Sequence, residues 1–176
     1  SAQITMGGYK SANEVLAEAQ AFALVLKAGA LPAPVTIAEF LQPDHVFLEV
    51  AGETLEEVLR AVLGRVPQAQ LPADRATILT RILERERQAP SALSHNVAIP
   101  HGRIEGISRP LVLVARPQHP LPVPGRTEPT RFLFILVTPV ESPRIHQVLL
   151  SHIAGLYESG FLEDRLYEAL DAHELH

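Results

Sequence analysis

Two uninterrupted apolar stretches, at residues 111–115 and 132–137, constrain the fold of this chain more than any other feature. A strand that faces water on one side alternates apolar and polar residues, whereas a strand covered on both faces is apolar throughout. The two stretches therefore predict central strands of a sheet that is packed between helices, and the fold class is α/β.

Shorter signals fill in the rest of the chain. Capping boxes at Ser11 and Thr54 begin two predicted helices, and Pro143 is suited to the first position of another that Ser142 caps. Five prolines between 117 and 130 predict an irregular connection, or one with an edge strand. We expect further strands at 46–50 and 96–99, and helices at 11–28, from 54 to near Gly64, 74–87, 142–158 and 162–171.

Composition excludes several classes of protein. The net charge is −5, with no basic cluster, so a nucleic acid is not an expected partner. No apolar run approaches the roughly 18 residues that span a bilayer, so we expect no membrane insertion. The chain has no cysteine, which excludes disulfides and zinc–thiolate sites and fits a cytoplasmic protein. Neither a cofactor nor a metal is expected.

One histidine has a position that suits chemistry. His101 directly follows Pro100 at the end of the short strand predicted at 96–99, and a strand end aims a side chain rigidly. A neutral imidazole is a good nucleophile near neutral pH, so His101 could accept a phosphoryl group without a metal. Arg85 and Arg103 are nearby cations. His146, in the first turn of a predicted helix, lies where free N–H groups favour an anion.

The same residues match a known family. Arg85-Glu86, then Ala98-Ile99-Pro100-His101, the apolar run ending in Thr138-Pro139, and the stretch 146–154 follow one another at its separations. Over residues 37–175 the chain resembles the fructose/mannitol-type (type 2) enzyme IIA domain of the bacterial phosphotransferase system, which includes nitrogen-regulatory IIA proteins. In that family the apolar strand ends in Ala-Pro.

The resemblance implies a mixed sheet sandwiched between helices and a set of site residues. His101 would be the phosphorylated histidine, Arg85 the phosphate-binding arginine and His146 the second active-site histidine. Ser91, which keeps a hydroxyl where the family has threonine, and Arg103 are further phosphate-binding candidates. The implied partners are the phosphocarrier protein HPr or a paralogue, and an enzyme IIB domain or a regulated target protein. A homodimer is a further option.

Two departures keep alternatives open. The family turn Thr-Gly-Ile-Gly-Asn-Gly reads Ser-Ala-Leu-Ser-His-Asn at 91–96, so every glycine is replaced. This change favours a regulatory, protein-binding domain with little sugar-linked transfer. Asn96 tolerates left-handed backbone better than most residues. The new His95 could also form a metal site with His101 and His146, although no carboxylate pattern supports one.

The N-terminal region forms a separate predicted unit. Residues 11–35 resemble a short segment of the export protein SecD that precedes one of its membrane spans, but they lack the span itself. We therefore expect a helical arm over residues 1–36 and the enzyme IIA type 2 domain over 37–176, and we transfer no export function.

Overall fold

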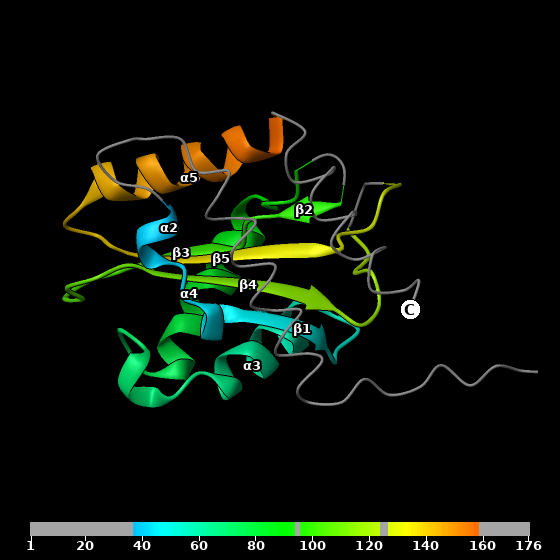
Figure 1. Ribbon diagram of the computed structural model, residues 1–176, viewed down its shortest axis with the longest axis horizontal. Helices are drawn as coiled ribbons and strands as arrows, with labels where there is room; N and C mark the ends of the chain where they lie inside the picture. Colours follow the sequence, from blue (N-terminus) through cyan, green and yellow to red (C-terminus); the bar gives the residue numbers. More distant parts are fainter. Residues whose placement is uncertain (1–36, 94–95, 124–126, 159–176) are drawn as a thin grey trace, which may run out of the picture.

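The computed structural model describes residues 37–93, 96–123 and 127–158. The helices expected at 11–28 and 162–171, and the N-terminal arm, lie outside these residues. The described part is a single sheet with helices on both faces (Figure 1). It contains no helix that is both long enough and apolar enough to cross a membrane.

The sheet is mixed and has its two longest strands in the middle. β4 (Leu111–Pro117) and β5 (Phe132–Pro139) run antiparallel, and β1 (Val46–Val50) pairs in parallel with β4. β2 (Val97–Ala98) and β3 (His101–Ile104) both pair in parallel with β5 and together form the other edge. The central strands are buried on both faces, which confirms the expectation from their apolar sequences.

The prediction for His101 was incomplete. It placed this residue beyond the last strand residue, whereas His101 is the first residue of β3. Pro100 has no N–H, so the edge strand is interrupted there. The Pro100 carbonyl still accepts a hydrogen bond of 3.0 Å from the N–H of Leu136, which keeps the chain beside β5 and lets pairing resume.

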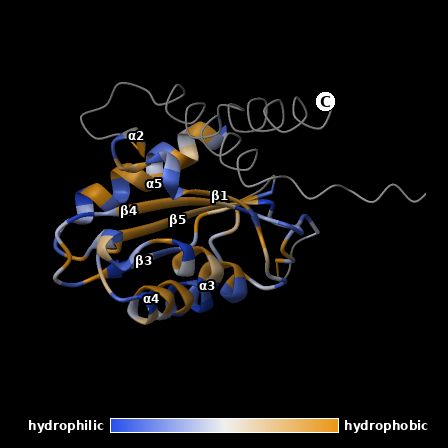
Figure 2. Ribbon diagram, turned by 60° about the horizontal axis from the view of Figure 1, so that its bottom comes forward, coloured by the Kyte–Doolittle hydropathy of each residue, from blue (hydrophilic) through white to orange (hydrophobic). Residues whose placement is uncertain are grey.

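Helices cover the sheet in two layers (Figure 2). α3 (Leu55–Arg65) and α4 (Arg75–Gln88) pack on one face, and α2 (Ile37–Phe40) and α5 (Pro143–Glu158) pack on the other. Two short 3₁₀ turns lie at Pro43–His45 and Gln68–Gln70. The three helices expected within the described residues are confirmed to within a residue or two at each end.

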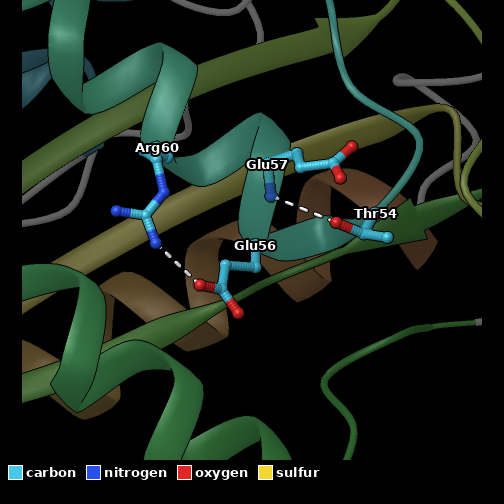
Figure 3. Close-up of polar contacts among 4 residues, drawn as sticks. All are labelled: Thr54, Glu56, Glu57 and Arg60. Carbon is cyan, nitrogen blue, oxygen red and sulfur yellow. Dashed lines mark hydrogen bonds and ion pairs between the residues drawn. The ribbon is translucent and has the colours of Figure 1, made fainter.

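The start of α3 follows its capping signal in part. The Thr54 hydroxyl accepts the N–H of Glu57 at 3.2 Å (Figure 3). The Glu57 carboxylate binds the N–H of Glu53 at 2.8 Å, one residue before the one that a capping box uses. Glu56 and Arg60 add an exposed ion pair of 2.7 Å one turn apart. Local signals therefore determine where this helix begins.

The proline-rich connection between β4 and β5 is irregular, as expected. Within its described residues, Leu121 and Thr130 form one antiparallel bridge, with two backbone hydrogen bonds of 2.8 Å. The bridge takes the place of an edge strand.

Candidate functional site

The candidate site lies at the β3 edge of the sheet, between α4 and α5. Side chains alternate along a strand. Gly102 and Ile104 face α4, so His101 and Arg103 face the side that α5 covers. Thr138 is paired with Arg103 in the neighbouring strand.

His101 is buried and has a defined hydrogen-bond partner. The residue is 9% exposed, and its Nδ1 lies 2.7 Å from the carbonyl oxygen of Ile99. A carbonyl only accepts hydrogen bonds, so Nδ1 must bear the hydrogen. In the neutral ring Nε2 therefore holds the lone pair and is the nucleophilic atom.

The backbone before His101 is held in place by two hydrogen bonds to residues 91–93. The Ile99 N–H donates to the carbonyl of Ser91 at 3.1 Å, and the N–H of Leu93 donates to the carbonyl of Val97 at 2.7 Å. Residues 91–93 thus run antiparallel to the edge strand. The carbonyl that orients His101 belongs to a residue with a fixed position.

Asn96 closes this turn in a left-handed conformation, with φ of 72°. Its carbonyl accepts the N–H groups of Arg131 and Phe132 at 2.7 and 3.0 Å, which attaches the turn to the start of β5. Asparagine tolerates this conformation through its short polar side chain. The left-handed conformation that the sequence analysis expected Asn96 to tolerate is the one that it adopts.

His146 reaches the site from the first turn of α5. Its ring centroid lies 5.3 Å from that of His101, at an interplanar angle of 52°. Its Nδ1 lies 2.8 Å from the Thr138 hydroxyl oxygen. Burial above all, and then the positive charge of His101, Arg103 and Arg85, lowers the pKa of His146 to about 4. The ring is therefore neutral at neutral pH.

The two arginines bring positive charge to the site. Arg85, in the last turn of α4, donates to the carbonyl of Ala89 at 2.9 Å, and Arg103 donates to the carbonyl of Val140. Both are near enough to lower the pKa of His146. Arg103 also acts on Glu141, whose pKa is lowered by backbone N–H groups, that of Gly106 above all, and then by the charge of Arg103. Within the described residues neither guanidinium forms an ion pair with a carboxylate.

Ser91 is connected to the site through its backbone. Its N–H donates to Oε2 of Glu86 at 3.1 Å, and its carbonyl holds Ile99. Among the described residues, neither its buried hydroxyl nor the buried Oε1 of Glu86 has a hydrogen-bond partner. Its expected contact with phosphate stays a prediction.

Sequence reasoning missed two residues of the site. A Cβ on Gly102 would lie 3.2 Å from Cβ of Arg81 and from the backbone nitrogen of Ile82, so this glycine lets α4 approach β3 closely. Thr138 is fully buried and contacts His146. The available signals were a glycine directly after His101 and a hydroxyl that ends an apolar strand.

The structure describes two of the three histidines of the metal site considered above, His101 and His146. His95 lies outside the described residues. Among the residues that the structure does describe, no three side chains of the metal-binding types gather.

Comparison with known proteins assigns the family. The model of the family described as "Phosphoenolpyruvate-dependent sugar phosphotransferase system, EIIA 2" matches residues 39–176. The chain therefore belongs to this family of phosphotransferase-system IIA domains. The main polar side chains of the candidate site in this chain are those of His101, His146, Arg85 and Arg103.

Individual proteins of similar sequence or structure support this family assignment. The chain is 26% identical to a nitrogen regulatory protein of Pseudomonas aeruginosa over 81% of this chain and 93% of that protein. It is 26% identical to the PTS system fructose-specific EIIA component of Haloferax volcanii over 72% and 82%, respectively. The crystal structure of nitrogen regulatory protein IIA-Ntr from Neisseria meningitidis shares the fold, with a TM-score of 0.62 and 22% identity over 73% of this chain and 95% of that one.

The resemblance to SecD is short. The chain is 60% identical to protein translocase subunit SecD of Anaeromyxobacter dehalogenans over 37 residues, which are 21% of this chain and 6% of that protein.

Proposed function

We propose that this protein is a cytoplasmic phosphohistidine carrier of the phosphoenolpyruvate-dependent phosphotransferase system. In this proposal His101 accepts a phosphoryl group from HPr or a paralogue and passes it to the cysteine of an enzyme IIB domain. The observation that supports it most is the hydrogen bond between His101 Nδ1 and the Ile99 carbonyl, because this bond leaves Nε2 as the nucleophile.

The transfer exchanges one P–N bond for another. The lone pair of His101 Nε2 attacks phosphorus, and the bond between phosphorus and the donor nitrogen breaks as its electron pair returns to the donor ring. His101 keeps its hydrogen on Nδ1, so the phosphorylated ring is positive. The Ile99 carbonyl stabilises that charge through the same 2.7 Å hydrogen bond. Onward transfer reverses these changes with a thiolate as the acceptor.

The surroundings suit the negative charge of the phosphoryl oxygens. Phosphoryl transfer depends mainly on positioning and charge stabilisation. Arg85 and Arg103 donate to backbone carbonyls, which do not cancel their positive charge. We assign phosphate binding to Arg85 and His146, with Arg103 and Ser91 in supporting roles.

The direct test is incubation with phosphorylated HPr and with several carrier paralogues. We expect one phosphoryl group per chain, acid-labile and alkali-stable, lost in His101→Ala and retained in the control His119→Ala, which changes an exposed histidine. Failure of every carrier to phosphorylate the wild-type protein would refute the proposal.

A regulatory role is the second candidate. The turn without glycines and the relative named as a nitrogen regulatory protein favour it. Here the same site modulates binding to a target protein, and little phosphoryl flux reaches a sugar. Partner capture that persists in His101→Ala would support this alternative. Capture that requires phosphorylated His101 would support the carrier.

A further inference from the structure

Thr138 stands out because it is a fully buried hydroxyl at the end of a strand that is otherwise apolar. It takes the place of the alanine in the Ala-Pro ending described above. Its Oγ1 lies 2.8 Å from Nδ1 of His146. The residue therefore adds a hydrogen bond to the site that an alanine cannot form.

The direction of this hydrogen bond follows from the needs of the hydroxyl. Thr138 has one hydrogen to donate, and within the described residues its only side-chain partner is His146 Nδ1. If Nδ1 held a hydrogen and donated it, the buried hydroxyl hydrogen would have no acceptor, which is costly away from water. The favoured arrangement has the hydroxyl donating to Nδ1.

This direction fixes the form of the second histidine. With Nδ1 as acceptor, the hydrogen of the neutral His146 ring must be on Nε2. His101 has the opposite form, because its Nδ1 faces the Ile99 carbonyl and its lone pair is on Nε2. The rings lie 5.3 Å apart, so one site combines a lone pair with a ring N–H donor.

We infer that Thr138 is a positioning residue that holds His146 in its Nε2–H form, as a hydrogen-bond donor toward the phosphoryl group on His101. The inference rests on the proposed function for its role in transfer. The assignment of the tautomer does not depend on that function. Thr138 acts through His146 and touches no reacting atom.

The test compares Thr138→Val, which keeps the shape, Thr138→Ala, which gives the family residue, and Thr138→Ser, which keeps the hydroxyl. Thr130→Val is the matched control, because Thr130 is also buried but its described hydrogen bonds use only backbone atoms. Nitrogen-15 NMR of the histidine rings at pH 7 reports which ring nitrogen holds the hydrogen. The rate of phosphorylation by phosphorylated HPr is the second measurement.

We expect His146 to be in the Nε2–H form in the wild type, in Thr138→Ser and in Thr130→Val. It should become a mixture of tautomers in Thr138→Val and Thr138→Ala. Loss of one oriented hydrogen bond to a charged group should slow phosphorylation about tenfold in these two variants.

An unchanged tautomer in Thr138→Val would overturn the inference and leave the carrier function standing. A mixture of tautomers without a slower rate would also overturn the positioning role. A wild-type protein that accepts no phosphoryl group would refute the carrier function, and with it the role of Thr138 in transfer. The NMR spectra would still decide the tautomer.

Discussion

Among the described residues, each edge of the sheet has one non-glycine residue with left-handed backbone, and the surroundings of the two residues differ. At the β1 edge, Glu49 has φ of 52° at an irregularity in the register, and its carboxylate pairs with Arg116 of β4. At the other edge, Asn96 has φ of 72° and closes the turn that leads into β2. At the first edge Arg116 is paired with a carboxylate, whereas at the other edge Arg85 and Arg103 donate to backbone carbonyls near the buried His101.

The two edges differ in the partners of their arginines, which decide whether positive charge is available to a ligand. Arg116 is largely buried and is paired with a carboxylate, so little of its charge is available to a ligand. Arg85 and Arg103 bind carbonyls, which satisfy hydrogen bonds without cancelling charge. The β3 edge also receives His146 from α5 and the close approach of α4 at Gly102.

The largest effect is expected where α4 approaches the β3 edge. In Gly102→Ala the new methyl group would lie 3.2 Å from backbone and Cβ atoms of α4, so the helix must shift. We expect a loss of about 1–3 kcal/mol in the free energy of unfolding and weaker phosphorylation, because Arg85 shifts with the helix. Urea denaturation measures the free energy of unfolding. Incubation with phosphorylated HPr measures the extent of phosphorylation.

The matched control is Gly155→Ala in α5, where none of the described residues outside the helix turn itself lies within 4 Å of the new methyl group. This variant should gain up to about 1 kcal/mol from helix propensity. Equal stability changes in the two variants would contradict the close packing of α4 on β3.

The second prediction concerns pH and the burial of His146. The unfolded chain takes up a proton at His146 below about pH 6.5, whereas the folded protein does so only near its pKa of about 4. Stability should therefore fall as the pH drops from 6.5 towards 4. We expect about 1 kcal/mol from this residue, because partial solvent contact screens the effect.

Urea denaturation of wild type and His146→Gln at pH 7, 5.5 and 4.5 isolates this contribution from that of the carboxylates. The stability difference between the two proteins should narrow or reverse in favour of His146→Gln as the pH falls. A difference independent of pH would show that His146 titrates normally.

The third prediction tests Asn96, the residue with left-handed backbone at the edge formed by β2 and β3. In Asn96→Ala the backbone keeps φ near 72° without the side chain that tolerates it, at a cost of about 1 kcal/mol. Asn96→Gly should equal or exceed the wild type in stability. Thermal unfolding of the three proteins gives the order. A higher melting temperature for Asn96→Ala than for Asn96→Gly would contradict it.

The smallest effect is expected at the opposite edge. Glu49→Gln removes the charge of a carboxylate that is 43% exposed and paired with Arg116, so we expect a loss of about 0.5 kcal/mol. Phosphorylation of His101 should not change. A marked loss of transfer would show that the two edges are coupled.

The sequence by itself determined the central strands, the helix starts and the candidate histidine. Continuous apolar runs report burial on both faces, and the signals at Thr54 and Pro143 act over a few residues, so one chain segment contains each of them. The order Arg85, His101, His146 indicated the family before any geometry was known.

Only the tertiary structure decided how the site is assembled. Pairing with β5 made His101 a strand residue, and contacts across the fold brought Thr138 to His146 and Gly102 against α4. Hydrogen-bond partners determine which ring nitrogen is nucleophilic, and the Ser91 carbonyl that holds Ile99 belongs to another segment of the chain. Residue types can suggest such partners, but their distances and directions exist only once separate segments pack together.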